Sequence, residues 1–172
     1  HGGLGSASQA ESAYKLDLLA AQEGFAIVYG DGFGNTWNGG LCCGQAALHN
    51  VDDVTFVSEM LDRVEAKLCV DTARIYSTGM SNGAIMTQRL GCELSTRYAA
   101  IAPVEGTIGV STCTPSKTLG VLEIHGWLDS NIPWYGGVGC GVSNANFNGV
   151  PFTVNKWLSA QSCTCSTYNA TC

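Results

Sequence analysis

The sequence lacks any apolar run that approaches the ~20 residues needed to cross a bilayer, so we expect no membrane-spanning segment. Charge is also scarce: charged residues make up 13% of the 172 residues, and the formal net charge is −6. A chain so short of basic residues cannot present a broad phosphate-binding surface, which argues against nucleic acid as a partner. No cysteine pair is matched by a second pair with histidines at metal-ligand spacing, so we expect no metal site.

The sequence also has no initiating methionine and no visible signal peptide. It begins at His1-Gly2-Gly3 and ends at Cys172. We interpret both ends as cuts in a longer chain.

Cysteine is abundant, with nine residues scattered along the chain. This usage favours disulfides and an oxidising, extracellular compartment over the alternative of reduced cysteines in a cytosolic enzyme. The sequon Asn169-Ala170-Thr171 permits glycosylation but is a weak signal.

Apolar periodicity predicts strands that alternate with helices. Short apolar runs typical of buried strands lie at 25–29, 74–78, 98–104 and 120–124, and helical spacing is found at 8–23, 54–68, 84–94 and 154–161. This alternation predicts an α/β fold with a mostly parallel sheet covered on both faces. We find no linker and no repeat, so residues 1–172 are expected to form one domain.

The stretch Gly79-Met80-Ser81-Asn82-Gly83 fits the G-x-S-x-G pattern between a predicted strand and a predicted helix. In that setting the pattern predicts a nucleophile elbow, a sharp turn that exposes the Ser81 hydroxyl beside a helix N-terminus. There the backbone amide of Asn82 can donate to a developing oxyanion. The alternative is an ordinary glycine-rich turn.

A Ser-His-acid triad also needs a carboxylate and a base. Asp129 follows a predicted strand and is therefore expected at the same sheet edge as Ser81, although it could also be a turn or cap residue. The other acid, Glu123, lies within the strand and is less well placed.

No base is evident, because no histidine follows Asp129. His125 is too close to Asp129 in sequence to be its partner, and His49 is expected at the surface or in a structural role. His1 opens an H-G-G stretch that is typical of an oxyanion loop, in which we assign the second donor to Gly3; the alternative is a flexible tail. The chain is therefore expected to be a fragment of an active enzyme or an inactive relative.

These motifs appear together with several others, in a fixed order: Asn35-Thr36-Trp37-Asn38 with Cys42-Cys43-Gly44, Val51-Asp52-Asp53-Val54, Ala102-Pro103-Val104, and His125-Gly126-Trp127-Leu128-Asp129 with Ile132-Pro133. Over nearly the whole chain they resemble the polyhydroxybutyrate depolymerase and feruloyl esterase group of α/β-hydrolases, similar to carbohydrate esterase family 1.

The resemblance implies a three-layer α/β-hydrolase sandwich, with its first strands and its last strand and histidine loop absent from these residues. It implies a secreted esterase that uses Ser81 and Asp129, needs no cofactor, and acts on polymer-linked esters: feruloyl or acetyl xylan, or hydroxyalkanoate polyester. It also implies a Cys92–Cys113 disulfide.

Trp37, Trp134 and Tyr135 could form a wall facing the acyl group or the polymer, or they could pack in the core or a lid. The alternative function is a binding protein that keeps the hydrolase scaffold without activity.

Overall fold

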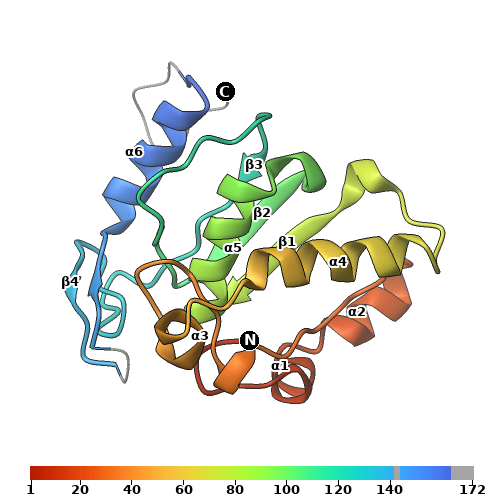
Figure 1. Cartoon of the computed structure of the whole chain (residues 1–172), viewed down its shortest axis with the longest axis horizontal. Helices are drawn as coiled ribbons and strands as arrows, with labels where there is room; N and C mark the ends of the chain where they lie inside the picture. Colours follow the sequence, from red (N-terminus) through yellow and green to blue (C-terminus); the bar gives the residue numbers. More distant parts are fainter. Residues whose placement is uncertain (142–143, 164–172) are drawn as a thin grey trace.

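The computed structural model describes residues 1–141 and 144–163, which form a small parallel sheet and several helices (Figure 1). The elements in chain order are α1 (Ala7–Tyr14), α2 (Leu16–Glu23), η1 (Phe33–Asn35), α3 (Gly44–Leu48), α4 (Asp53–Glu65), η2 (Thr72–Arg74), β1 (Tyr76–Met80), α5 (Asn82–Glu93), η3 (Ser95–Arg97), β2 (Ala100–Val104), β3 (Gly120–Val121), β4 (Gly137–Val138), β5 (Asn146–Phe147) and α6 (Val150–Ala160). Among these described helices, none combines the length and apolar character needed to span a membrane.

The main sheet has the order β1-β2-β3, and both neighbouring pairs are parallel. Tyr76 lies opposite Ala100, and Met80 lies opposite Val104, which in turn bridges to Ile124 beyond the end of β3. The expected parallel sheet with helices is thus confirmed, with three strands in the part of the chain that is described. Its register brings the carboxyl ends of β1, β2 and the β3 segment to one edge.

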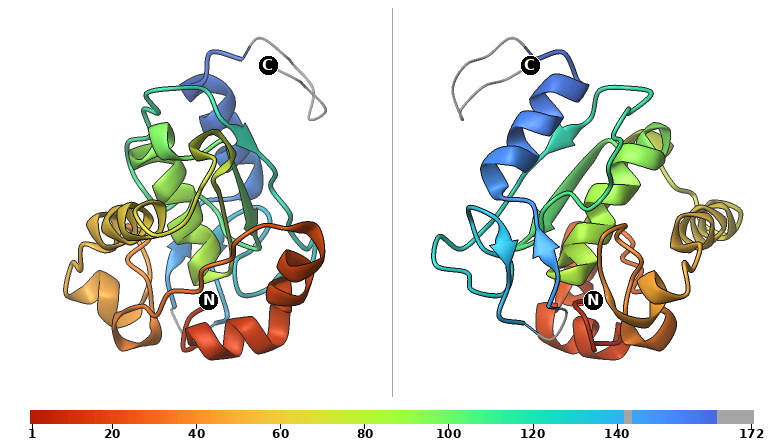
Figure 2. Two further views of the ribbon diagram at one scale, coloured as in Figure 1. Left: turned by 90° about the vertical axis from the view of Figure 1, so that its right-hand side faces the viewer. Right: turned by 60° about the vertical axis from the view of Figure 1, so that its left-hand side comes forward.

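Helix α5 packs along one face of β1 and β2 (Figure 2). The main core lies there, where Leu90 of α5, Ile101 of β2 and Trp157 of α6 meet in one buried cluster. On the opposite face Tyr76, Leu122 and Ile124 are 63%, 61% and 47% exposed. The expectation of a sheet covered on both faces is therefore wrong for the described residues, because α5 and the elements packed against it occupy the same side.

The expected strand at 25–29 is also wrong. This segment is extended but pairs with no strand among the described residues. A cavity of about 1120 Å³ separates it from β1, and both segments line that cavity. Phe25 and Val28 are each 45% exposed, and the Tyr29 hydroxyl is buried without a partner in the described part. An apolar extended segment becomes a strand only where another backbone lies within hydrogen-bonding reach.

The single helix expected over 8–23 is divided into α1 and α2 by Lys15, which has a left-handed backbone with φ of 52°. Lys15 N–H donates to the Glu11 carbonyl and ends α1, and Gly24, with φ of 74°, ends α2 as expected. The other three predicted helices are confirmed as α4, α5 and α6, although their ends differ by one to four residues.

The disulfide between Cys92 and Cys113 is confirmed. Cys42 and Cys43 are joined to each other, whereas Cys69 and Cys140 are free and exposed. The sequon at 169–171 lies outside the described residues.

Candidate active site

Ser81 occupies the turn between β1 and α5, with φ of 56° and ψ of −120°. A positive φ is strained for any residue with a side chain, and here the Ser81 N–H is held by the Val104 carbonyl at 2.9 Å. The glycines around it have no room for a side chain. A Cβ on Gly79 would come within 2.6 Å of the Gly83 backbone, and a Cβ on Gly83 would come within 2.5 Å of the His1 carbonyl oxygen. The motif therefore folds locally into the strand-turn-helix geometry expected from its residue types.

Asn82, the first residue of α5, is buried and binds the backbone of Trp37 twice. Its Oδ1 accepts from Trp37 N–H at 2.6 Å, and its Nδ2 donates to the Trp37 carbonyl at 2.8 Å. The backbone N–H of Asn82 lies in the first helical turn, where no intrahelical acceptor exists. Trp37 itself is only 6% exposed, which favours the packing alternative over a wall that faces substrate.

The N-terminal segment lies directly against this turn. A Cβ on Gly2 would lie 3.6 Å from Ser81 Cβ, and one on Gly3 would lie 3.7 Å from Asn82 Cβ. His1 fixes the segment, because its carbonyl accepts from Trp37 Nε1 at 3.1 Å and its Nε2 accepts from Gly32 N–H at 3.0 Å. These contacts exclude the flexible-tail alternative for residues 1–3, whereas the oxyanion role of Gly3 stays a prediction.

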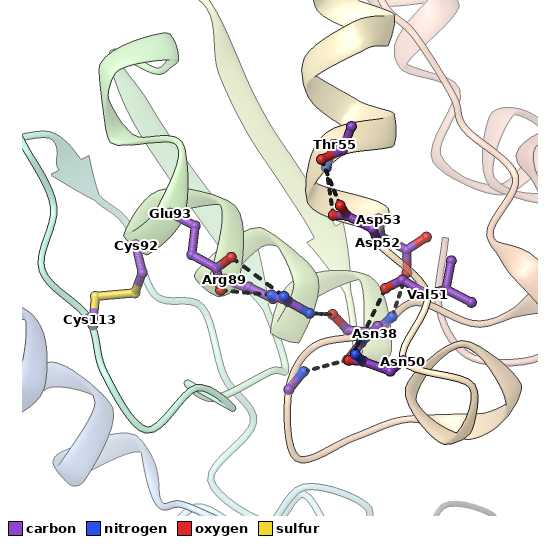
Figure 3. A network of polar contacts seen from close by, with 11 residues as sticks. Asn38, Asn50, Val51, Asp52, Asp53, Thr55, Arg89, Cys92, Glu93 and Cys113 are labelled. Atoms are coloured by element: carbon purple, nitrogen blue, oxygen red, sulfur yellow. Dashed lines mark hydrogen bonds and ion pairs between the residues drawn. A yellow bond between two sulfur atoms is a disulfide. The ribbon is translucent and has the colours of Figure 1, made fainter.

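The loop that carries Trp37 is anchored by its next residue, Asn38 (Figure 3). Asn38 N–H donates to Asp53 Oδ2 at 2.7 Å, its Nδ2 donates to the Val51 carbonyl at 2.9 Å, and its own carbonyl accepts from Arg89 Nη1 at 2.8 Å. Burial raises the pKa of Asp53, while the bond from Asn38 opposes that rise. The loop is thus tied to the start of α4 through Asp53 and to the second half of α5 through Arg89.

Asp129 lies on the loop that follows the β3 segment, at the same sheet edge as Ser81. Met80 pairs with Val104, and Val104 bridges to Ile124, so Ser81 and His125 each follow the end of this row of paired residues. The backbones at Ser81 and His125 are therefore two strand spacings apart, or about 10 Å. The Asp129 side chain is 8% exposed, and its Oδ1 accepts from Asn131 N–H at 2.8 Å and Ile132 N–H at 3.0 Å. The other carboxylate oxygen of Asp129, Oδ2, accepts from neither of these two amides.

Two buried polar side chains, Glu123 and His125, lie next to this loop. The sequence analysis assigned neither of them a role. Nδ1 of His125 is 3.3 Å from Glu123 Oε1, and its Nε2 is 2.8 Å from the Ile132 carbonyl. Burial raises the pKa of Glu123. Burial lowers the pKa of His125, but its bonds to Glu123 and Ile132 and the charges of Glu123 and Asp129 outweigh that effect and raise it overall. The signal in the sequence was the spacing Glu-x-His directly before the loop that carries Asp129, which we call the acid loop.

Trp134 and Tyr135 are brought together with Trp127, which the sequence interpretation had not included. The Trp127 ring lies 4.9 Å from the Trp134 ring and 5.5 Å from the Tyr135 ring, edge-on to the latter. Trp127 and Tyr135 are 60% and 74% exposed. An exposed aromatic cluster thus flanks Asp129 in the chain.

None of the three histidines is placed as a base for Ser81. His1 accepts from Gly32, His125 is enclosed by Glu123 and Ile132, and His49 is exposed beside Gln45, in keeping with the surface role expected for it. Within the described ranges, no group of three His, Cys, Asp or Glu side chains could hold a metal ion.

Comparison with known proteins found relatives among polysaccharide-linked esterases. The chain is 31% identical to feruloyl esterase B of Piromyces equi in an alignment that covers 94% of this chain and 31% of that protein. It is 33% identical to a probable feruloyl esterase C of Aspergillus clavatus over 99 residues, or 57% of this chain and 36% of the relative. A bifunctional acetylxylan esterase/xylanase of Neocallimastix patriciarum is 27% identical over 116 residues, or 66% and 16% of the two chains.

The chain spans about a third of the length of the first two relatives and less of the third. No family model matches the chain. The similarities support an esterase family of the carbohydrate-esterase kind, whereas the polyhydroxybutyrate depolymerase part of the expected resemblance stays a prediction.

Proposed function

Taking the similarity to feruloyl and acetylxylan esterases as the premise, we propose that this chain carries the nucleophile and the acid of a serine carboxylic ester hydrolase of the α/β-hydrolase fold. One observation carries the proposal: Ser81 has a strained backbone at a strand-to-helix turn, at the same sheet edge as the loop that holds Asp129. Strain of this kind persists only where the surrounding structure enforces it, and it is concentrated at functional sites.

In the proposed reaction, the Ser81 hydroxyl oxygen attacks the ester carbonyl carbon while a base removes its proton. The carbonyl oxygen becomes an oxyanion that accepts hydrogen bonds from the backbone N–H groups of Asn82 and Gly3. The alcohol then leaves with the proton from the base, and water hydrolyses the acyl-enzyme by the same steps. The chemistry requires no cofactor.

We propose that the base is a histidine outside these 172 residues. His1 and His125 are held by other hydrogen bonds, and His49 lies at the surface beside Gln45. Asp129 would orient that histidine and stabilise its cationic form. The bonding of Asp129 supports this role, because the two loop amides bind Oδ1, whereas Oδ2, which lies 3.4 Å from His125 Nε2, keeps a lone pair that can accept from a further proton donor.

We propose feruloyl or acetyl esters of plant cell-wall polysaccharide as the substrates. The exposed rings of Trp127 and Tyr135, with Trp134 beside Trp127, offer flat apolar surfaces on which an aromatic acyl group or a sugar ring can stack. Polyester of hydroxyalkanoates is the alternative that the substrate panel below tests.

We propose that the protein acts outside the cell and that residues 1–172 belong to one domain. The disulfide between Cys92 and Cys113 supports the first proposal, because such bonds persist in oxidising compartments. The continuous packing of α4, α5, α6 and the sheet around one core supports the second.

The proposal is tested by fluorophosphonate labelling of the natural protein and by hydrolysis of methyl ferulate, p-nitrophenyl acetate and polyhydroxybutyrate. We expect the probe to react at Ser81, and Ser81→Ala to lower kcat by several powers of ten. Ser159→Ala, which changes an exposed serine in α6, is the matched control and should leave labelling unchanged. A folded protein that is not labelled at Ser81 and hydrolyses no ester would instead be a binding protein on this scaffold.

A further inference from the structure

The imidazole of His125 has no access to solvent and plays no part in the reaction proposed above. Its side chain is 0% exposed, and the carboxylates of Glu123 and Asp129 beside it are 10% and 8% exposed. Burial of three titratable groups in one place is costly unless their polar atoms are paired. The contacts of His125 therefore need an explanation.

The geometry determines which nitrogen of His125 carries a proton. Nε2 is 2.8 Å from the Ile132 carbonyl oxygen, and a carbonyl can only accept, so Nε2 must be the donor. Nδ1 faces Glu123 Oε1 at 3.3 Å, and one proton between these two atoms satisfies both of them. The pair therefore shares a single proton, whichever atom holds it.

Glu123 is itself held from the side of the nucleophile helix. Its Oε2 accepts from Gln88 Nε2 of α5 at 2.7 Å. Gln88 is fully buried, and its Oε1 accepts from Trp157 Nε1 of α6 at 2.6 Å, which fixes the orientation of the amide. The chain of bonds runs without interruption from α6 through α5 to His125.

At its other end the chain of bonds reaches the acid loop. Ile132 N–H donates to Asp129 Oδ1, while the Ile132 carbonyl accepts from His125 Nε2. The same Nε2 lies 3.4 Å from Asp129 Oδ2. His125 thus binds the carbonyl of the residue whose N–H binds one carboxylate oxygen of Asp129, and it borders the other oxygen.

Resting on the proposed function, we propose that His125 is a positioning residue, which fixes the carboxylate of Asp129 through the Ile132 carbonyl and is itself oriented by Glu123 and Gln88. His125 does not touch the substrate. Its part is to keep Oδ2 pointed toward the base, because a misplacement of about 1 Å at a catalytic group costs on the order of 10²-fold in rate.

The charged groups around His125 are consistent with a fixed rather than a switching role. Glu123 faces Nδ1, and Asp129 faces Nε2. Glu105, which follows β2, lies against the acid loop, since a Cβ on Gly126 would be 3.3 Å from Glu105 Oε1. The charges that raise the pKa of His125 are those of these two carboxylates, Glu123 and Asp129.

The test compares His125→Gln with His125→Ala in the natural protein, using methyl ferulate. A glutamine amide N–H can replace Nε2 as donor to Ile132, whereas alanine cannot. We expect His125→Ala to lower kcat about 10²-fold with KM changed less than about threefold, and His125→Gln to restore kcat to within about threefold of wild type. His49→Ala, at an exposed histidine bonded only to Gln45, should match wild type.

Two kinetic results would overturn the proposal: a kcat for His125→Ala within threefold of wild type, or a His125→Gln protein as impaired as His125→Ala. Should His125→Ala not fold, ¹⁵N NMR of the wild-type imidazole decides, since Nε2 must then carry a proton throughout pH 5.5 to 8; an unprotonated Nε2 rejects the proposal. Failure of the esterase proposal itself is recognised separately, because wild type would then not be labelled at Ser81.

Discussion

Replacing Asn82 by alanine tests how the turn at Ser81 is held. The substitution removes two hydrogen bonds, of 2.6 and 2.8 Å. It leaves the Trp37 N–H buried without its partner, whereas the Trp37 carbonyl still accepts from the N–H groups of Gly39 and Cys43. The unsatisfied N–H costs about 1–3 kcal/mol and the lost bond to the carbonyl about 0.5–1.5 kcal/mol. We expect a loss of stability near 3 kcal/mol, because Asn82 is 2% exposed and water has little access to the gap. For a chain of this size, that loss lowers Tm by about 6–12 °C.

The assay is urea and thermal unfolding followed by tryptophan fluorescence. Asn155→Ala, at an exposed position of α6, is the matched control and should change stability by less than about 0.5 kcal/mol. Asn82→Asp should be at least as destabilising as Asn82→Ala at pH 7, because it places a carboxylate oxygen against the Trp37 carbonyl. If Asn82→Ala proves as stable as Asn155→Ala, the two bonds do not hold the loop and the reasoning fails.

Two further predictions concern stability. The Cys92–Cys113 disulfide joins residues 21 apart, so Cys92→Ser with Cys113→Ser should cost about 3 kcal/mol in thermal unfolding, whereas Cys69→Ser, at an exposed free thiol, should cost almost nothing; equal effects would contradict the assignment. Burial raises the pKa of Tyr98 to about 12, above the ~10 of an unfolded chain, so the folded state keeps its proton longer. The resulting stability is complete below pH 10 and is lost as the pH rises from about 10 to 12, so urea unfolding at pH 9, 10 and 11 should show a decline that Tyr98→Phe reduces; an unchanged decline would mean that other groups cause it.

The parts of the fold that sequence reasoning predicted are those set by local contacts. The turn at Ser81 depends on Gly79 and Gly83, which have no room for a Cβ. The backbone of Gly83 occupies that space at Gly79, and the backbone of His1 occupies it at Gly83. Helix α4 depends on an apolar stripe and on Asp52, whose Oδ1 accepts from Thr55 N–H at the helix start.

The parts that were not predicted depend on distant partners. The 25–29 segment has the pattern of a strand, but it pairs with no strand within residues 1–141 and 144–163. Lys15 divides a helix although nothing in its residue type requires a left-handed backbone. Trp37 is buried because Asn82, 45 positions away, binds its backbone, and the role of Gln88 depends on Trp157, 69 positions away. Pairings of this range are invisible to periodicity.

One helix connects the two halves of the proposed site. Asn82 and Gln88 lie six residues apart on α5, so they are about 9 Å apart along the helix axis and point about 120° apart around it. Asn82 binds the loop of Trp37, whereas Gln88 binds Glu123 beneath the acid loop. This explains why α5 is buried on nearly every side, including its polar residues, when its apolar positions alone would need only one covered face. The placement of α5 therefore helps to set the distance between Ser81 and Asp129, so a substitution that shifts this helix should disturb both residues together.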